Sequence, residues 1–445
     1  MKSYKLSNGK LFDTVDLRNN ALDTSIELNL SMNENEIEFL QSADLNTCLL
    51  INGKICECYE DQAFLSLYIQ TSVLVDCFQN FDPSSTMWLS LLLSTKEPFQ
   101  YLSSSPLLLH PNNLLSESHF PLMTLVLPLT LDDLSRGLIL LDSLRDVPNG
   151  YVYEFFIVTP DHENEIVLSS LSISCSKLQF PCRFLPESKL FLRHPTTWKQ
   201  FGYATQMAIK LLISKFIKTS HYLTLDADHI FLHSPPLSHL FRWNEETQFF
   251  QSIYHYEEYY VHQPWWEGSK LLLKTPNIPQ SKLSFGVTPA LMSTWGAQMT
   301  LFLLTQAIAE DLLAEQTNQQ LPMIRSLLRS QVLSREVEER IEQEWLESLG
   351  VNGRLWTEYT LYKIALEAIQ VFDSLYFPEH GQCYLHCHNV WFREQLPWQY
   401  EVAARNASCL FSVVQSNTGL SSSDLYRQFL SFRSDRNNLH SIGIN

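Results

Sequence analysis

Short apolar runs alternate with helix-patterned segments after residue 120, and this alternation constrains the fold more than any other feature of the sequence. Leu122–Leu127 and Phe155–Asp161 each begin with a continuous apolar run, as expected of strands buried on both faces. Arg183–Pro186 is a third candidate strand. Between the first two, four leucines recur at helical spacing: Leu131, Leu134, Leu138 and Leu141. This order predicts an open, mostly parallel α/β sheet flanked by helices.

The same pattern continues into the second half of the chain. Tyr203–Lys218 predicts a helix with one apolar stripe. His221–Leu225 then predicts a strand that runs directly into Asp226-Ala227-Asp228. A further helix and two late strands are expected at Trp356–Ile369, Cys383–Val390 and Leu410–Gln415.

We expect three parts along the chain. Residues 1–119 differ in character and are expected to form an N-terminal accessory α+β domain of unknown role. Residues 120–420 form the α/β domain, with a charged helical insertion near 300–348, and residues 421–445 form a C-terminal tail. Within the first part, Leu49–Ile55 predicts a hairpin, because Asn52-Gly53 supplies the two residues of a type I′ turn between apolar arms.

Composition and charge narrow the classes of partner. The 445 residues carry 31 Lys and Arg against 48 Asp and Glu, a formal charge of −17, so a nucleic-acid partner is not expected. No apolar stretch is long enough to predict a membrane span, and the polar N-terminus predicts no signal peptide. We therefore expect a cytoplasmic protein whose nine cysteines are reduced thiols.

Asp226 and Asp228 are the main candidates for chemistry. They follow a predicted buried strand, and ligands of open α/β sheets bind beyond the carboxyl ends of the strands. In extended backbone, residues two apart point the same way, so the two carboxylates would face one cation. Hard cations such as Mg²⁺ and Mn²⁺ prefer oxygen ligands, and such a metal neutralises a diphosphate leaving group. The alternative is a solvated turn at the end of the strand.

Several segments around this motif follow one another in a recognisable order. They are Gly202-Tyr203, Gln206, Lys210-Leu211, Tyr222–Asp228, Phe285–Leu291, Thr357–Tyr362 and Ser412–Ser416. In these motifs the chain resembles an uncharacterised glycosyltransferase-like family with the GT-A fold, over residues 121 to 420. The family usually has a tryptophan in place of Tyr203 and a glutamine in place of Met207.

The resemblance implies roles for residues after the Asp-x-Asp motif. In GT-A enzymes a glycine-bearing loop, an acidic residue at a helix start and a late metal-binding histidine follow in that order. Here they match Gly286, Glu358, and His386 or His388. Glu358 is the expected general base, and a plain helix-start glutamate is the alternative.

Two further pairs complete the expected site. Gln206 and Lys210 lie four residues apart on one helix face and are expected to bind the donor; the alternative for Lys210 is a solvated helix lysine. Trp266 and Tyr359 are expected to bind the acceptor, and packing in the core or at the rim is the alternative for Trp266.

The segment Cys383–His388 holds two cysteines and two histidines. If it is a strand, Cys383 and Cys387 face one way and His386 and His388 the other, so a structural zinc site made of these four is not expected. Both histidines would then share a face, and one of them could join Asp228 on the metal.

Together these observations predict a metal-dependent glycosyltransferase that moves a sugar from a nucleotide-sugar donor to an unknown acceptor, with Mn²⁺ or Mg²⁺ as cofactor. One alternative is a non-catalytic GT-A-like protein that only binds a nucleotide-sugar. Another is a phosphatase-type hydrolase with Asp226 as nucleophile, although three predicted strands precede this aspartate where that mechanism expects a position near the domain's start.

Overall fold

The computed structural model describes strands β1–β9 before residue 120 by their backbone, and most of the chain from Phe120 to Ser441. Its gaps after residue 120 are 192–201, 245–248, 259–262, 276–277, 279–282, 286–288, 316–338, 340–341, 345, 350–354 and 379–382.

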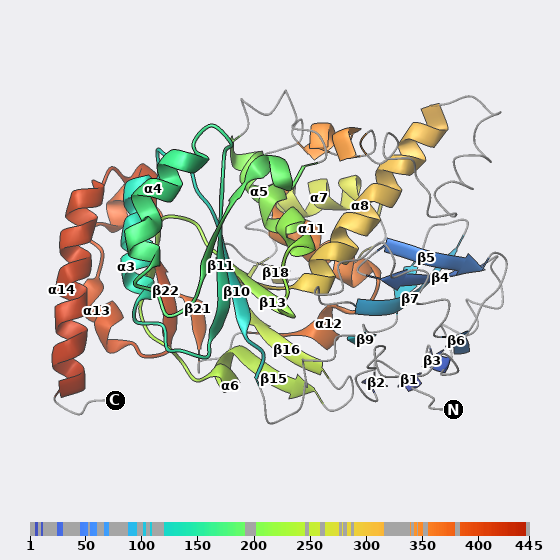
Figure 1. Cartoon of the computed structure of the whole chain (residues 1–445), viewed down its shortest axis with the longest axis horizontal. Helices are drawn as coiled ribbons and strands as arrows, with labels where there is room; N and C mark the ends of the chain where they lie inside the picture. The colour runs from blue at the N-terminus through green and yellow to red at the C-terminus, as the bar shows by residue number, and fades with distance from the viewer. Residues whose placement is uncertain are drawn as a thin grey trace.

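A five-stranded sheet forms the centre of the molecule (Figure 1). Its order is β12-β11-β10-β13-β19, and only the pairing of β13 with β19 is antiparallel within it. The strands are β10 (Met123–Pro128), β11 (Val152–Thr159), β12 (Cys182–Pro186), β13 (His221–Thr224) and β19 (Ala290–Ser293). The predicted mostly parallel α/β sheet is confirmed.

Helices cover both faces of this sheet, which explains why its strands are continuously apolar. Leu125 and Leu127 of β10 pack in a core with α3 (Leu134–Leu144) and α4 (Asn164–Cys175). Val126 lies between them on the opposite face, in a core with the second group of helices. That group comprises α5 (Gly202–Leu212), α7 (Gln263–Leu272), α8 (Thr294–Glu315) and α11 (Glu358–Ala368). The two groups lie on opposite sides of β10 and β11 (Figure 1).

A second, three-stranded sheet, in the order β14-β22-β21, continues from the end of β13. Its strands are β14 (His229–Phe231), β22 (Cys409–Val413) and β21 (Tyr384–His386). The predicted strand Cys383–Val390 is therefore shorter than expected. It ends because His388 adopts a left-handed backbone conformation with φ of 55°, which interrupts the alternation of a strand.

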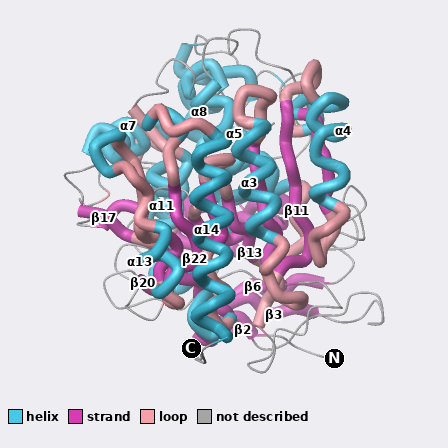
Figure 2. Tube along the Cα trace, turned by 90° about the vertical axis from the view of Figure 1, so that its left-hand side faces the viewer, coloured by secondary structure: helices cyan, strands magenta, loops and turns pink. Residues whose placement is uncertain are grey.

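The residues that we separated as a C-terminal tail form a long helix, α14 (Ser422–Ser441), preceded by α13 (Tyr400–Arg405). Leu425, Phe429 and Phe432 of α14 are buried, and α14 runs alongside α3 (Figure 2). Arg433 Nη2 lies 2.8 Å from Asp146 Oδ1, which joins the helix to the turn after α3.

The expected insertion near 300–348 begins inside α8, whose residues up to Ile308 are largely buried in the core. Residues 300–308 therefore pack with the sheet's helices, because α8 contacts α5 and α11. Residues 316–338 lie outside the described part of the chain.

Smaller elements surround the central sheet. They are α6 (Leu237–Leu240), β15 (Phe241–Asn244), β16 (Phe249–Tyr254), β17 (Tyr256–Glu258), β18 (Leu283–Phe285), α12 (Phe372–Leu375) and β20 (Tyr376–Pro378). None of the helices in the described residues is long and apolar enough to cross a membrane.

Residues 1–119 contribute two further sheets, in the orders β2-β1-β3-β6 and β5-β4-β7-β8, with β9 pairing β7. The strands are β1 (Lys5–Ser7), β2 (Lys10–Leu11), β3 (Ser25–Asn29), β4 (Leu45–Ile51), β5 (Lys54–Tyr59), β6 (Ser66–Gln70), β7 (Trp88–Thr95), β8 (Tyr101–Ser103) and β9 (Leu107–Leu108). Ile51 pairs with Lys54, which confirms the predicted hairpin; its turn, Asn52-Gly53, lies outside the described residues. A separate accessory domain stays a prediction.

Gly268 allows α7 to approach the chain just before α11. A Cβ atom at Gly268 would lie 1.9 Å from the backbone oxygen of Leu355, so the backbone itself would have to move. We expect Gly268→Ala to lower the free energy of unfolding by about 1–3 kcal/mol, measured by urea denaturation. Gly202→Ala is the matched control, because the new Cβ meets nothing within 4 Å at the first residue of α5; an equal loss in both variants would contradict the close-approach argument.

His221 predicts a pH-dependent stability. Burial lowers the pKa of His221 from 6.5 to about 3, so the folded protein keeps this imidazole neutral while the unfolded chain binds a proton below pH 6.5. Stability should therefore fall as the pH drops through this window, with a contribution from His221 of about 2 kcal/mol between pH 7 and pH 5. Denaturation of wild type and His221→Gln at both pH values measures this contribution, and parallel losses in the two proteins would refute it.

Candidate functional site

The Asp226-Ala227-Asp228 motif forms a turn at the carboxyl end of β13. Leu225 N still donates to Val126 O of β10 at 2.8 Å, and His229 N then donates back to Asp226 O at 3.2 Å. The strand thus ends before Asp226, and the strand alternation on which we based a shared direction for the two carboxylates does not apply. Asp226 is 35% exposed and Asp228 13% exposed at the side chain, so both reach the surface of the sheet edge.

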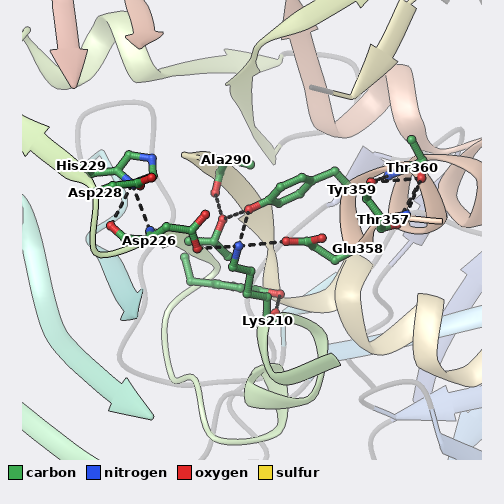
Figure 3. A network of polar contacts seen from close by, with 11 residues as sticks. Lys210, Asp226, Asp228, His229, Ala290, Thr357, Glu358, Tyr359 and Thr360 are labelled. Carbon is green, nitrogen blue, oxygen red and sulfur yellow. Dashed lines mark hydrogen bonds and ion pairs between the residues drawn. The ribbon is translucent and has the colours of Figure 1, made fainter. Parts of the chain in front are cut away.

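Lys210 is a buried ammonium that connects the motif to a distant helix (Figure 3). Its Nζ lies 2.9 Å from Asp226 Oδ1 and 2.9 Å from Glu358 Oε1. Burial alone would lower the pKa of Lys210, but Asp226 and Glu358 together raise it well above its ordinary value, so the side chain is charged. Lys210 therefore fixes Asp226 of the turn to Glu358 at the start of α11.

A chain of hydrogen bonds orders this ion pair further (Figure 3). Lys210 Nζ donates to Tyr359 Oη at 3.4 Å, and that hydroxyl lies 2.8 Å from Thr224 Oγ1. Because Thr224 Oγ1 donates to the backbone oxygen of Ala290, the tyrosine hydroxyl is the donor to Thr224. The network thus runs in one direction from α5 through α11 to the last residue of β13.

The helix start of α11 places Glu358 and Tyr359 in this network. Thr357 is the N-cap, and its Oγ1 accepts from Thr360 N at 3.2 Å while Thr360 Oγ1 accepts from Thr357 N. This capping box sets the residues after Thr357 into the first helical turn. The side chains of Glu358 and Tyr359 consequently point toward Lys210.

His229 holds the other aspartate of the motif. Its Nδ1 lies 3.3 Å from Asp228 Oδ1 and 2.8 Å from the backbone oxygen of Asp226, and Asp226 N lies 3.1 Å from the same nitrogen. Burial alone would lower the pKa of His229, but the contacts to Asp228 and Asp226 raise it. We did not single out His229 from the sequence, although its place directly after the motif, three residues from Asp226, is the signal of a closing turn.

Two ionisable residues at the start of α3, Asp133 and Arg136, lie near Asp228. Burial raises the pKa of Asp133, and the nearby Asp228 raises it further. Arg136 is buried with its guanidinium donating to the backbone oxygens of Val414 and Leu420 at 2.5 and 2.8 Å. The carboxyl ends of β10 and β13 therefore form one polar edge.

This edge fits a hard divalent cation by its donor chemistry. The ion-pair network and the turn contain three carboxylates, those of Asp226, Asp228 and Glu358, against the single ammonium of Lys210. The excess of negative charge lies on the two partly exposed aspartates, whose oxygens are the ligands that Mg²⁺ and Mn²⁺ prefer. Asp226 and Asp228 are the residues that would hold such an ion.

The structure buries both Glu358 and Lys210, and their expected roles stay predictions. The side chain of Glu358 is 3% exposed and faces Lys210, whereas a general base must reach the proton of an acceptor. Lys210 is 4% exposed and does not extend toward solvent as a phosphate-binding lysine would. Both residues position Asp226, because their charges neutralise one another inside the protein.

The expected acceptor residues are also core residues. Trp266 is fully buried, and Lys363 Nζ lies 5.5 Å from its ring centroid. Tyr359 is 3% exposed and belongs to the hydrogen-bond chain described above. Among the expected donor residues, Gln206 lies half-buried on α5, and Gly286 falls outside the described residues.

The two late histidines do not share a face. His388 follows the end of β21, and its Nε2 lies 3.2 Å from Asn406 Nδ2, before the start of β22. Asp228 abuts the other end of β22, where Val414 N donates to Asp228 O at 2.9 Å. The imidazole of His388 thus contacts Asn406, and the expected metal ligation by His388 together with Asp228 stays a prediction.

His386 lies on the same sheet face as His229, through the register His386–Phe411–Phe231. Its Nδ1 is 2.6 Å from Asn389 Nδ2, and Asn389 Oδ1 accepts from Val413 N at 2.9 Å, which orients the amide. The amide thus donates to Nδ1, and in the neutral imidazole the proton sits on Nε2. This hydrogen-bond pattern favours His386 as a donor over a metal ligand; its ligation stays a prediction.

The sequence did not predict whether the side chain of Tyr203 lies near the Asp226–Asp228 motif. Its ring is 55% exposed at the start of α5, the position where the resembling family carries tryptophan. Burial of its hydroxyl raises its pKa, and the carboxylates of Glu358 and Asp226 contribute to this rise. An exposed aromatic ring therefore borders the ion-pair network.

Comparison with known proteins gives a family and a distant fold likeness. Residues 121–436 match the family described as "Family of unknown function (DUF6492)", so the chain belongs to this family. No curated protein sequence matches the chain. The solved structures that match include glycosyltransferases, as the sequence resemblance implied.

Three of these structures illustrate the likeness. Mouse xyloside xylosyltransferase 1 is 11% identical, with a TM-score of 0.33, and the match covers 66% of this chain and 98% of that one. The galactosyltransferase LgtC with donor and acceptor sugar analogues is 10% identical, with a TM-score of 0.34, and the match covers 71% of this chain and 96% of that one. Core-mannan synthase A of Aspergillus fumigatus in its Mn/GDP form is 8% identical, with a TM-score of 0.32, and the match covers 68% of this chain and 90% of that one. The likeness is distant, and the chemistry considered below depends on the residues of this chain.

The Lys210–Glu358 pair predicts strong coupling in stability. Lys210→Met should lower the free energy of unfolding by about 3–5 kcal/mol, because it leaves the buried carboxylate of Glu358 without its cation. Adding Glu358→Gln should recover part of the loss, and urea denaturation of the four proteins of this double-mutant cycle measures the coupling.

Arg427→Met serves as the control, since Arg427 is 77% exposed and its partner Asp424 is 42% exposed at the side chain. Breaking this exposed pair should leave the free energy of unfolding nearly unchanged. Additive losses in the Lys210–Glu358 cycle would contradict a direct buried ion pair.

Proposed function

We propose that this chain is a metal-dependent glycosyltransferase that takes its sugar from a nucleotide-sugar donor. The observation that carries the proposal is the pair of partly exposed carboxylates, Asp226 and Asp228, at the carboxyl end of a central strand of a mostly parallel sheet. Ligands of open α/β sheets bind at this edge. The Asp-x-Asp motif and its neighbours along the sequence are those of the glycosyltransferase-like family that the chain resembles.

The charges at the edge support a cation and a diphosphate. Asp226 and Asp228 would hold Mn²⁺ or Mg²⁺, which neutralises the negative charge that develops on a leaving nucleoside diphosphate. Lys210 and His229 contact one aspartate each and keep both carboxylates in fixed positions. A site whose charged groups are fixed before the ligand arrives loses no free energy to their reorganisation during the reaction.

Neighbouring residues are suited to binding and orienting the donor. Gln206, half-buried on α5, and the exposed ring of Tyr203 lie on the helix that carries Lys210. An aromatic ring at such an edge can stack on the flat face of a base or sugar.

A second candidate, a hydrolase with Asp226 as nucleophile, makes a different demand on this carboxylate. Such a nucleophile must attack phosphorus directly. Asp226 Oδ1 instead lies 2.9 Å from Lys210 Nζ, whose charge lowers the nucleophilicity of the oxygen it contacts. This contact favours a role for Asp226 in holding a cation. Release of phosphate from simple phosphate monoesters would favour the hydrolase.

The proposal predicts metal-dependent binding of a nucleoside diphosphate. Asp228→Asn should weaken the Mn²⁺-dependent affinity for UDP or GDP by about 10- to 100-fold or more, because even changes around a metal's own ligands cost that much. Asp228 is the better position to change, since Asp226 also pairs with Lys210. Isothermal titration calorimetry with and without Mn²⁺ measures the effect.

Asp424→Asn controls for the loss of one negative charge, because Asp424 is an exposed residue of the first turn of α14. It should bind as wild type does. Equal affinity in the Asp228 variant and wild type would reject the proposed metal site. Binding without sugar transfer, in a screen of nucleotide-sugars against sugar acceptors, would favour a non-catalytic nucleotide-sugar-binding protein.

A further inference from the structure

Three potential metal-binding side chains meet on the α13 and α14 side of the second sheet, apart from the Asp226–Asp228 edge. One potential ligand atom from each of Cys387, His388 and Cys409 lies within 4.8 Å of the other two. Cys387 and His388 follow the end of β21, and Cys409 begins β22. Cys409 packs in the core that α13 and α14 share with β14. The sequence pattern missed this group because Cys409 is 22 residues from Cys387.

The two sulfurs are placed as a disulfide pair in this structure, and the reduced state that we expected for these cysteines stays a prediction. A disulfide, however, has no need of a third polar side chain. Here the amide of Asn406 faces both the sulfur of Cys387 and the imidazole of His388. Their arrangement suggests a second state of the same two cysteines.

The amide of Asn406 fixes the orientation of the histidine. Asn406 Oδ1 accepts from Ser408 N at 3.1 Å, so its Nδ2 faces Cys387 Sγ at 3.7 Å and His388 Nε2 at 3.2 Å. Since Nδ2 is a donor, His388 Nε2 presents its lone pair and the proton of the neutral ring sits on Nδ1. This is the tautomer that binds a metal through Nε2.

The backbone at His388 is held in an uncommon conformation. Its φ of 55° is left-handed, a conformation that non-glycine residues rarely adopt. The hydroxyl of Ser412 donates to His388 O at 2.8 Å and holds this conformation. The turn brings the imidazole to the cysteine pair, where a continued strand would have placed it on the opposite face.

We propose that the reduced pair Cys387 and Cys409 binds Zn²⁺ together with His388. Two thiolates and one imidazole form a donor set typical of zinc, and tetrahedral ligands about 2.0–2.3 Å from the ion would leave the fourth position to water. Asn406, through its amide, donates to a thiolate from outside the ligand set. The ion would join β21 to β22 and hold the 22-residue segment between them.

The conversion between the two states balances with a phosphine as the added reductant. The phosphine gives two electrons to the disulfide, water supplies the two protons, and the products are two thiols and the phosphine oxide. Binding of Zn²⁺ then releases the two thiol protons. The disulfide and the zinc site exclude one another, because both use the same pair of sulfurs.

The test uses the full chain reduced with a phosphine, with Zn²⁺ as the probe. Alkylation by N-ethylmaleimide, read residue by residue by mass spectrometry, should slow at least about tenfold at Cys387 when Zn²⁺ is added. Cys383 is the internal control, because it is a buried cysteine outside the cluster, and its alkylation should not change. Equal rates at Cys387 with and without Zn²⁺ would overturn the proposal.

Two variants separate zinc binding from simple folding effects. His388→Asn keeps a residue that tolerates a left-handed backbone but removes the imidazole, so protection of Cys387 should require at least about tenfold more Zn²⁺. Asp228→Asn should leave the protection unchanged, which distinguishes this site from the nucleotide edge. Unaltered protection in His388→Asn would show that the histidine is no ligand and would overturn the three-residue site.

Discussion

One buried charge, the ammonium of Lys210, determines the geometry on which the rest of the candidate site depends. It lies on α5, yet it contacts Asp226 beyond β13 and Glu358 at the start of α11, so three elements far apart in the sequence converge on one nitrogen. A buried ammonium is costly unless paired, and this requirement ties α11 and the end of β13 to α5. The carboxylate of Asp226 is thereby fixed at the sheet edge.

The sheet explains why that edge is polar at all. Its central strands are buried on both faces, so apolar residues fill their length and polar groups concentrate at their carboxyl ends. Asp133, Asp226 and Asp228 all lie there, after β10 and β13. An acidic protein with a net charge of −17 thus gathers some of its negative charge at one edge of the sheet.

The second sheet shows how one backbone angle redistributes functional groups. A continuous strand would place His386 and His388 together on the face that carries His229. The left-handed conformation at His388 ends the strand and moves that imidazole to Cys387 and Cys409, on the α13 and α14 side. One histidine therefore remains on the sheet face of His229, and the other lies in the cysteine cluster.

The sequence by itself determined the parallel sheet, the helices around it and the position of Asp226 and Asp228, because these follow from local periodicity and from the apolar character of β10, β11 and β13. Only the tertiary structure decided what Glu358, Tyr359 and Trp266 do. All three were candidates for contact with a ligand, but packing of α7 against α11 and of α11 against α5 buries them. It also decided the group of Cys387, His388 and Cys409, since burial and contacts between distant residues depend on packing that no local pattern records.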